Sequence, residues 1–223
     1  MSSKIHAVIF DMDGLLLDTE RVYLEGLRQT RAAFDLDLND ELFFSLIGLD
    51  REKTEIKLAA GLEEHVDFDA FNKEWRQRTE VLFMQPIPIK PGVHDLLDRL
   101  QSLKMPYAIA TATKTEKAQH HLTLTGLIDL FPIVIGGDQV ENGKPAPDIY
   151  LKAAAALNIE PHLCAAFEDS DTGTRAAVAA GTRTVQVPDL ISPSPEVVAL
   201  KHHIATDLIS GARHLGLMEM AHS

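Results

Sequence analysis

Two aspartates separated by one residue follow an apolar segment near the start of the chain, in the run Asp11-Met12-Asp13-Gly14. The preceding run, residues 5–10, is mostly apolar and rich in β-branched side chains, which predicts a strand buried on both faces. At the carboxyl end of a parallel strand the chain opens into the crevice where α/β sheets place their ligands. One carboxylate there could attack an electrophile while the other transfers a proton, provided that a metal keeps the first ionised. An Asp-x-Asp alone also suits a loop or a helix cap, and the preceding strand favours the chemical interpretation.

A second acidic pair, Glu168-Asp169 followed by Ser170, also comes directly after an apolar strand pattern. If the strands lie in the order 3-2-1-4-5, the fourth strand is the neighbour of the first, and Asp169 lies next to Asp11. Converging carboxylates repel one another unless they hold a cation, and ligands that are all oxygens suit Mg²⁺. The pair also suits the N-terminus of the next helix, where acids are stabilising, and the two interpretations are compatible.

Two further candidates could bind a phosphoryl group. Thr111 ends the second apolar run, where its hydroxyl and the free backbone N–H groups after it, beginning with Ala112, could meet phosphoryl oxygens. Lys144 lies in the loop Gly143-Lys144-Pro145-Ala146-Pro147, whose Gly and Pro residues restrict its shape. That loop follows the third strand, on the same edge as the acidic residues.

The elements that must position these residues alternate between strand and helix. Apolar runs typical of buried strands recur at residues 107–111, 133–135, 163–167 and 184–187, and helical patterns separate them. This alternation predicts an α/β fold, a parallel sheet with helices on both faces. Residues 18–85 break the alternation with several helical patterns and no convincing strand. There, an apolar stripe of Phe68, Phe71, Trp75 and Leu82 indicates helix packing rather than an aromatic ligand site.

Composition excludes several classes of function. With 21 basic and 33 acidic residues the net charge is 21 − 33 = −12, which disfavours nucleic acid and anionic membranes as partners. Cys164 is the single cysteine, so a disulfide framework within the chain is excluded and a reducing compartment is expected. The apolar stretch before Asp11 is too short for a signal peptide, and no run approaches a membrane span. The sequence therefore predicts a soluble, cytoplasmic protein.

Some further residues invite attention without predicting a site. The adjacent pairs His120-His121 and His202-His203 are expected on helices, where neighbouring side chains diverge, so they make poor metal clusters. Cys164 falls inside a buried strand pattern and is expected to be inert packing. Asp171 is an extra acid near the expected metal, and we assign it no catalytic role.

The four chemical elements, taken together and in order, resemble the motifs of the haloacid dehalogenase-like hydrolase superfamily over essentially the whole chain. The run from Phe10 through Asp11 and Asp13 to Glu20 is similar to its first motif, and Thr111 to its second. Lys144 is similar to its third motif, and Glu168-Asp169-Ser170 to its fourth. The helical stretch resembles the cap of the branch that contains β-phosphoglucomutase and small sugar-phosphate or nucleotide phosphatases. The resemblance implies a Rossmann-like core of residues 1–17 and 88–223 with an all-α helical cap inserted at 18–87.

The resemblance also implies a role for each residue. Asp11 would be the nucleophile that forms an aspartyl-phosphate, and Asp13 the acid/base that protonates the leaving alcohol. Mg²⁺ would be bound by the Asp11 carboxylate, the Asp13 backbone carbonyl and Asp169, with Glu168 binding it directly or through an intervening group. Thr111 and Lys144 would hold the phosphoryl oxygens. Because dehalogenases of this superfamily lack the second aspartate of the first motif, Asp13 argues against dehalogenation.

The function expected from all this is Mg²⁺-dependent hydrolysis of a small phosphorylated metabolite, a sugar phosphate or a nucleotide. Arg51 lies where β-phosphoglucomutase-like caps carry a phosphate-binding Arg, and Arg78 is a second basic candidate; either one also suits a solvated helix face. A phosphomutase is the alternative, weakened because Tyr23 stands where β-phosphoglucomutase carries a His after its first motif. A non-catalytic binding protein is a remote alternative, since every chemical position is filled. Nothing in the sequence indicates the oligomeric state, and a monomer is the default expectation.

Overall fold

The computed structural model describes residues 4–37, 40–47, 51–62 and 65–219, and the side chains of Arg51 and Glu52 lie outside the description. The chain divides into two compact units, which are described separately. One comprises Met1–Asp18 and Pro88–Ser223, and the other Thr19–Ile87.

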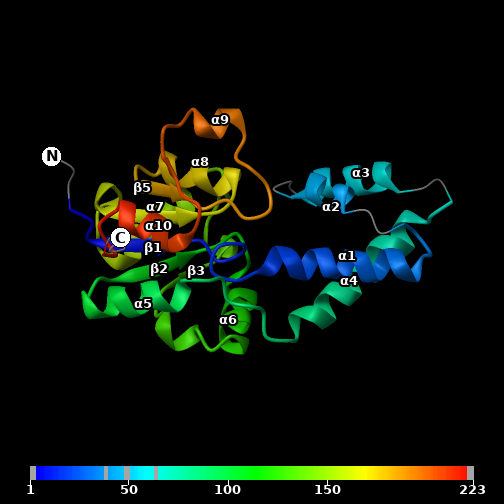
Figure 1. Cartoon of the computed structure of the whole chain (residues 1–223), viewed down its shortest axis with the longest axis horizontal. Helices are drawn as coiled ribbons and strands as arrows, with labels where there is room; N and C mark the ends of the chain where they lie inside the picture. Colours follow the sequence, from blue (N-terminus) through cyan, green and yellow to red (C-terminus); the bar gives the residue numbers. More distant parts are fainter. Residues whose placement is uncertain (1–3, 38–39, 48–50, 63–64, 220–223) are drawn as a thin grey trace. The chain divides into compact units, whose positions relative to one another are not determined.

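A six-stranded parallel sheet organises the first unit, in the order β3-β2-β1-β4-β5-β6 (Figure 1). Its first five strands follow the predicted order 3-2-1-4-5. In the centre, β1 pairs with β4 and places Phe10 beside Phe167. The strands are β1 (Ala7–Phe10), β2 (Tyr107–Ala110), β3 (Val134–Ile135), β4 (Cys164–Glu168), β5 (Arg183–Gln186) and β6 (His203–Ile204).

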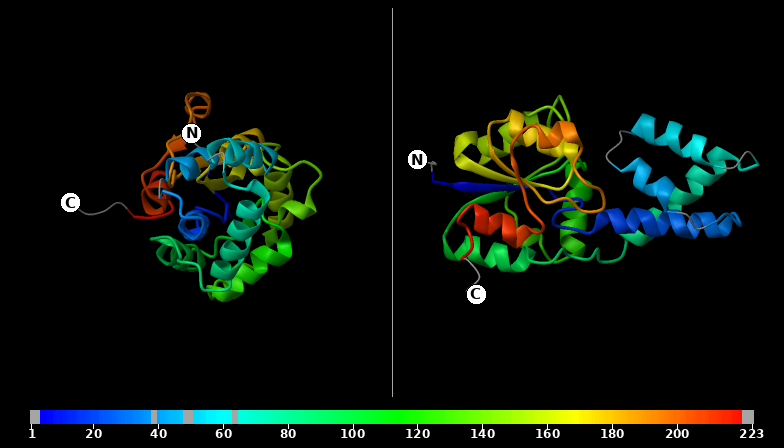
Figure 2. Two further views of the ribbon diagram at one scale, coloured as in Figure 1. Left: turned by 90° about the vertical axis from the view of Figure 1, so that its right-hand side faces the viewer. Right: turned by 45° about the horizontal axis from the view of Figure 1, so that its top comes forward.

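The helices of this unit cover both faces of the sheet, as the apolar pattern of the strands requires. On one face, Ala7 and Ile9 of β1 pack into a buried cluster with α7 and α8; on the other, Phe10 stacks on Phe167 with ring centroids 5.6 Å apart. Figure 2 shows α7 and α8 on one side of the sheet and α5 and α10 on the other. The helices are α5 (Val93–Ser102), α6 (Thr115–Leu124), α7 (Asp148–Leu157), α8 (Asp171–Ala179), α9 (Pro195–Val198) and α10 (Leu208–His214), with short 3-10 turns at Ile128–Leu130, Gly137–Gln139 and Pro161–Leu163.

The second unit is all helical in its described residues. Two long helices, α1 (Thr19–Ala33) and α4 (Phe68–Phe83), pack against each other, and α2 (Glu41–Leu46) and α3 (Arg51–Gly61) complete the unit. The predicted apolar stripe supplies this packing, since Phe71 of α4 is fully buried and meets Phe34 with ring centroids 5.2 Å apart. The stripe therefore joins helix to helix, as predicted.

The segments that leave and re-enter the first unit run beside each other. The Asp18 N–H donates to the Pro88 carbonyl at 2.9 Å, and the Lys90 N–H donates to the Leu16 carbonyl at 2.9 Å. The two segments that lead to and from the inserted helices are thus paired with each other within the first unit.

The structure corrects one expectation near the C-terminus. His202 and His203 do not lie on a helix: His203 begins β6, and His202 precedes it in the connection from α9. The sequence analysis missed β6 because a two-residue strand is too short to show an alternating pattern. Its parallel pairing with β5, which sets Val185 beside His203, depends on tertiary contacts.

The single thiol provides a test of this packing. Cys164 is fully buried in β4, and burial raises its pKa to about 11. Because the thiolate is the reactive form, we expect no reaction of the native protein with a thiol reagent near pH 8. One thiol per chain should react after unfolding in denaturant. The reaction can be monitored by absorbance. Rapid labelling of Cys164 in the native protein at pH 8 would contradict this placement of β4.

No helix within the described ranges is long and apolar enough to cross a membrane.

Candidate active site

Three carboxylates converge at the carboxyl edge of the central strands. Asp11 follows β1 directly, and its N–H donates to the Phe167 carbonyl at 2.9 Å, so the end of β1 is tied to the end of β4. Glu168 is the last residue of β4, and Asp169 comes next. One carboxylate oxygen from each of the three lies within 4.8 Å of the others. The parallel pairing of β1 with β4 is therefore what brings these two distant stretches of sequence together.

Lys144 joins two of the three carboxylates. Its Nζ lies 2.5 Å from Asp11 Oδ1 and 2.5 Å from Glu168 Oε1, and its side chain is only 6% exposed. Burial by itself lowers the pKa of Lys144, but Asp11 and Glu168 outweigh burial and the net shift is upward. The pKa of Asp11 is raised well above its ordinary value, chiefly by burial and further by Glu168 and Asp13, with Lys144 opposing. The site is thus a largely buried cluster of charges in which one ammonium offsets part of the negative charge.

Glu168 is fully buried and held from several sides. Besides Lys144, it accepts a hydrogen bond from the Tyr150 hydroxyl at 2.7 Å and one from the Ser170 hydroxyl at 3.1 Å. Burial and the nearby carboxylates, first Glu168 and then Asp11, raise the pKa of Tyr150, which keeps its hydroxyl a donor. Tyr150 is not among the residues predicted from the sequence. The only signal is its place on α7, six residues after Lys144, and a helical tyrosine by itself does not indicate a site.

Two glycines allow the backbone to approach these carboxylates closely. Gly14 has a φ of +83°, and a Cβ there would lie 2.1 Å from Asp169 Oδ2. At Gly173, on the first turn of α8, a Cβ would lie 1.8 Å from Glu168 Oε1. Each position therefore needs glycine, because a side chain would displace a carboxylate of the cluster.

The Asp13 carboxylate is held apart from this cluster by two hydroxyls. Thr111 Oγ1 donates to Asp13 Oδ2 at 3.0 Å, and Thr113 Oγ1 donates to the same oxygen at 2.8 Å. The Thr113 N–H also donates to Thr111 Oγ1 at 3.0 Å. Thr113 was not among the residues expected from the sequence. Its only signal is the alternation Thr-Ala-Thr after β2, which turns both hydroxyls to one side and leaves Ala112 exposed between them.

The remaining candidates lie elsewhere or outside the described residues. Asp171 accepts hydrogen bonds from Gln186 at 3.2 Å and from the Ser194 N–H at 3.0 Å, contacts that tie α8 to β5 and to the segment after it. Burial raises the pKa of Asp171 and these bonds lower it, with a net decrease. Arg78 pairs with Glu74 at 2.7 Å on α4. The side chain of Arg51, the first residue of α3, lies outside the described residues.

The donor set fits a hard divalent cation. All three converging groups offer carboxylate oxygens, the ligands that Mg²⁺ and Ca²⁺ prefer, and nitrogen or sulfur ligands for softer metals are not part of the cluster. With Asp11, Glu168 and Asp169 ionised and one lysine among them, the net charge of the group is −3 + 1 = −2. A bound divalent cation would neutralise that charge.

Tyr150 offers a test of how this cluster is supported. Tyr150→Phe removes one hydrogen bond to a buried carboxylate, so we expect the free energy of unfolding to fall by about 1–3 kcal/mol. Chemical denaturation would measure it. Tyr107→Phe is the matched control, because its hydroxyl only accepts a 3.3 Å bond from Gln101 and its loss should cost less than about 1 kcal/mol. Equal losses for the two variants would contradict the support assigned to Tyr150.

A parallel sheet that gathers carboxylates and a buried lysine at the ends of its central strands defines an α/β enzyme suited to a charged substrate. The match of residues 8–187 to the family of haloacid dehalogenase-like hydrolases goes further, and the chain belongs to this family. The resemblance stated from its motifs is thereby confirmed.

Known relatives point in the same direction. A phosphorylated carbohydrates phosphatase from Thermotoga maritima is 35% identical over 182 residues, which cover 81% of this chain and 84% of that protein. Among solved structures, a hydrolase of this family from Deinococcus radiodurans with bound phosphate and sodium is 26% identical, with a TM-score of 0.82 over 97% of this chain and 99% of that one. A Thermotoga maritima structure provisionally assigned as a β-phosphoglucomutase is 29% identical, with a TM-score of 0.78 over 96% of this chain and 98% of that one.

Proposed function

We propose that this chain is a Mg²⁺-dependent phosphomonoesterase that hydrolyses a small phosphorylated metabolite, a sugar phosphate or a nucleotide, through an aspartyl-phosphate on Asp11. The observation that carries the proposal is the cluster in which Lys144 Nζ lies 2.5 Å from both Asp11 and Glu168, with Asp169 beside them. This arrangement offers a carboxylate oxygen to attack phosphorus, which a bound Mg²⁺ would keep ionised, and a buried cation to balance the phosphoryl charge. The phosphatase relative supports the same reaction class.

Asp11 and Asp13 divide the chemistry between them. An Asp11 oxygen forms a bond to phosphorus while the bond from phosphorus to the substrate oxygen breaks, and Asp13 gives its proton to that leaving oxygen. In the second step Asp13 takes a proton from the water that attacks the aspartyl-phosphate. That step releases inorganic phosphate and restores the Asp11 carboxylate, so protons and bonds balance over the cycle.

The hydroxyls of Thr111 and Thr113 control where the acid/base group lies. A hydroxyl has one proton to donate, and in this structure both are directed to Asp13 Oδ2. Thr111 can therefore donate to a phosphoryl oxygen only when Thr113 alone holds Asp13. The backbone N–H of Ala112 is the next donor proposed for the phosphoryl group, and Lys144 the cation.

Mg²⁺ would be held by the Asp11 and Asp169 carboxylates and the Asp13 backbone carbonyl, with Glu168 binding directly or through an intervening group. When bound, it would supply positive charge against the phosphoryl oxygens and keep Asp11 ionised. Specificity for the rest of the substrate is proposed for the helical unit of residues 19–87, with Arg51 as the candidate that meets a second phosphate.

Asp13→Asn should remove the group that transfers protons while leaving Asp11 able to attack phosphorus. For a sugar phosphate we expect kcat to fall roughly 10²–10⁴-fold, since general acid catalysis contributes about that factor. An aryl phosphate with a weakly basic leaving group needs less protonation, so its phosphorylation step should slow far less. Rapid-mixing measurement of the first turnover with both substrates checks this. Equal slowing of that step for both would contradict the role given to Asp13.

A β-phosphoglucomutase-type phosphomutase is the second candidate, favoured by the provisionally assigned relative. It would use the same aspartyl-phosphate but return the phosphoryl group to the sugar. Against it stands Tyr23, in the place where β-phosphoglucomutase carries a His. Tyr23 lies within α1, its ring packs on Phe83 with centroids 5.0 Å apart, and its carbonyl accepts from Trp75 at 3.1 Å. A side chain packed in this way is poorly suited to couple substrate binding to proton transfer.

The deciding experiment is a screen of sugar phosphates and nucleotides, with Mg²⁺ or with EDTA, in which the release of inorganic phosphate is measured. We expect release from a subset of the substrates, and reversible loss of activity in EDTA. For the mutase, β-glucose 1-phosphate with a trace of the 1,6-bisphosphate should be tested separately. Glucose 6-phosphate formation with negligible phosphate release would establish the mutase. Full activity in EDTA would refute the requirement for a metal. Binding without turnover of any substrate would support the non-catalytic alternative.

A further inference from the structure

We propose that the first unit carries a second anion-binding site, at a cavity between the β5–β6 edge of the sheet and the end of α10, which takes a small ligand bearing a phosphate-type dianion. This site is separate from the carboxylate cluster, and the proposal does not depend on the chemistry assigned to Asp11.

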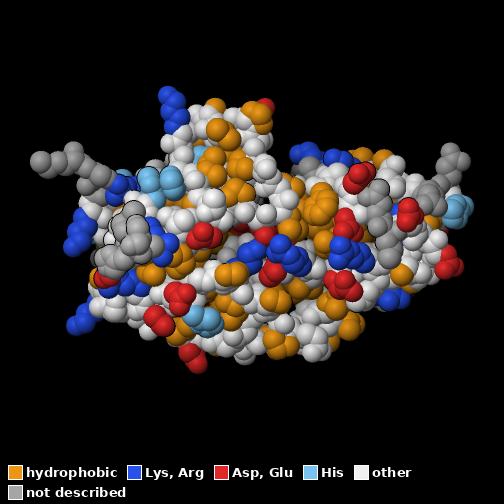
Figure 3. All heavy atoms as spheres, viewed as in Figure 1, with side chains coloured by type: hydrophobic (Ala, Val, Ile, Leu, Met, Phe, Trp, Pro, Cys, Tyr) orange, Lys and Arg blue, Asp and Glu red, His pale blue; other side chains and the backbone are white. Residues whose placement is uncertain are grey.

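The cavity is lined by an unusual concentration of basic groups. It has a volume of about 310 Å³, within the range of small-molecule sites. Five of its lining residues can carry positive charge: Arg183, Lys201, His202, His203 and His214. None of the described residues that line it is acidic, although the chain has a net charge of −12. Figure 3 shows histidine side chains gathered over β5 with a basic side chain beside them.

Most of the residues that line this basic cavity lie away from the catalytic centre, and His202 is linked to it through Gln186, which donates to Asp171. Asp171 begins α8 just after the carboxylate cluster, whereas Val178, near the other end of α8, lines the cavity. Seven residues of helix separate the two, a rise of about 10 Å. Likewise, Arg183 is the first residue of β5, and the catalytic carboxylates lie at the opposite, carboxyl edge of the sheet.

Two of the imidazoles are stacked face to face, His203 of β6 on His214 of α10. Their ring centroids are 3.5 Å apart and their planes differ by 3°. Burial lowers the pKa of His203. The neighbouring His214 lowers it further, because protonating both rings would place two positive charges in contact. A dianion at the rings would offset that repulsion, which makes protonation and anion binding mutually favourable.

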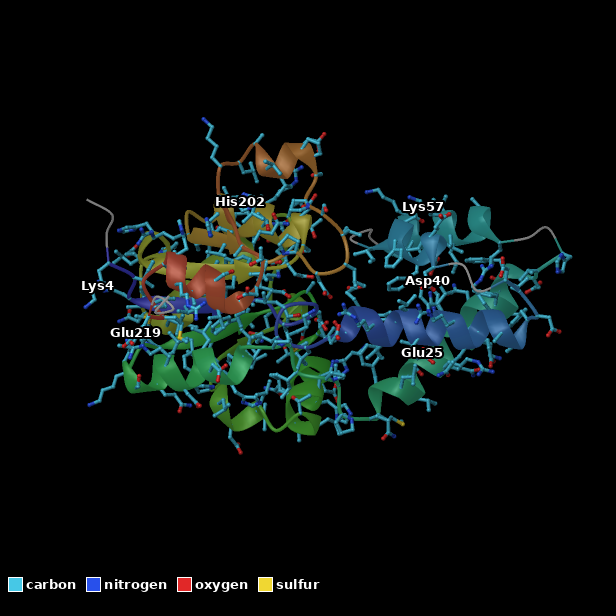
Figure 4. All side chains as sticks on the ribbon, viewed as in Figure 1. Lys4, Glu25, Asp40, Lys57, His202 and Glu219 are labelled. Carbon is cyan, nitrogen blue, oxygen red and sulfur yellow. The ribbon has the colours of Figure 1, made fainter. Side chains whose placement is uncertain are left out.

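His202 has a ring nitrogen that becomes a donor only when the ring is protonated. Its Nε2 donates to Gln186 Oε1 at 2.8 Å, which leaves Nδ1 as the lone-pair nitrogen of the neutral ring, buried without a hydrogen-bond partner. A buried ring nitrogen of this kind is costly unless a ligand or water meets it. Figure 4 labels His202, which lies on the connection from α9 to β6.

The other charged groups around the imidazoles come from each neighbouring element. From β5 comes Arg183, and from the segment before β6 comes Lys201. From α8, Asp171 raises the pKa of His202, although burial lowers it more. On α10, Arg213 is next to His214 and donates to the Glu219 carbonyl at 3.0 Å. Three basic residues therefore neighbour the rings, and Asp171 is the carboxylate that acts on His202.

A metal fits these histidines less well than an anion. Across the described residues, the only three metal-ligating side chains with ligand atoms within 4.8 Å of one another are Asp11, Glu168 and Asp169. Stacked parallel rings also direct their nitrogens side by side rather than toward a common point. The cavity is too small for a polyanion such as nucleic acid, which the acidic surface also repels.

The test is NMR of the histidine imidazoles in the full chain, titrated with pH in sodium sulfate or in sodium chloride at equal ionic strength. Sulfate is the probe because it stays doubly charged over this pH range and is not hydrolysed. We expect sulfate to raise the pKa of His203 by about one unit, equivalent to tenfold tighter binding to the protonated ring. Spectra of His203→Asn and His214→Asn assign the resonances.

Lys201→Gln should weaken the sulfate effect at least several-fold, since Lys201 is exposed and its loss is not expected to unfold the chain. Lys57→Gln, an equal change of charge on α3 (Figure 4), is the matched control and should leave it unchanged. Equal shifts in sulfate and chloride, or equal effects of the two variants, would overturn the proposal. Repeating the titration with inorganic phosphate and with a sugar phosphate identifies the occupant, because the tighter of the two ligands produces the shift at lower concentration.

Discussion

Asp11→Asn is expected to abolish turnover, with kcat reduced roughly 10⁴-fold or more, as is typical when an enzyme loses its nucleophile. An amide cannot form the bond to phosphorus, so no phosphoenzyme should appear in rapid-quench or mass-spectrometric measurements. The effect should be the same for aryl and sugar phosphates, because the attack precedes any difference in leaving group. The fold should persist, since the substitution preserves shape and the Asp11 N–H bond to the Phe167 carbonyl.

The matched control is Asp98→Asn, the same chemical change on the exposed face of α5. It should retain ordinary kcat and KM. Because deamidation restores aspartate, the Asp11→Asn sample must be checked by intact mass before the assay. Substantial steady-state turnover by a chemically homogeneous Asp11→Asn enzyme would refute the assignment of the nucleophile.

Lys144→Met should have the next largest effect, a fall in kcat/KM of roughly 10²–10³-fold, comparable to removal of one preorganised donor to a transition state. The methionine side chain has nearly the same length but no charge, so the buried pair of Asp11 and Glu168 loses its shared cation. Repulsion between these carboxylates and the phosphoryl dianion then rises. Kinetics at saturating Mg²⁺ measure the loss.

Lys152→Met serves as the control for Lys144→Met, because Lys152 is exposed on α7 and donates only to the Gln139 carbonyl, at 2.6 Å. It should leave kcat/KM within a factor of about two. Lys144→Arg should not restore activity, since the larger planar guanidinium does not fit a position that is 6% exposed between two carboxylates. Near-normal activity of Lys144→Met would contradict the role of Lys144.

Much of the fold follows from local patterns. The strands on which the site depends carry apolar residues on both alternations, because a central parallel strand is buried on both faces. That pattern predicted β1, β2, β4 and β5 within one or two residues. Helix ends also follow from local residue types: α7 begins at Asp148 after Pro147, and Gly126, with a φ of +73°, follows the end of α6, where the left-handed conformation of a glycine commonly ends a helix. The short strand β6 escaped because two residues carry no period.

The site residues divide in a similar way. Asp11, Asp13, Lys144 and the pair Glu168-Asp169 were predicted as candidates from the sequence, because each follows a predicted strand or lies in its loop. Their meeting at one edge required only the strand order. Which atoms pair was decided by the tertiary structure, since the partners are far apart in the chain: 133 residues separate Lys144 from Asp11, and 100 separate Thr113 from Asp13.

The sequence by itself therefore determined the class of fold and the candidate residues for the chemistry, because burial and chain order are visible in local patterns. Tertiary structure alone decided that Tyr150 supports Glu168, and that Thr113 shares Asp13 with Thr111. It also decided that His202 and His203, which the sequence predicted on a helix and at no site, line a basic cavity with His214. A hydrogen bond or a stacked ring pair depends on distances of a few ångströms between elements, and no periodicity along the chain encodes those distances.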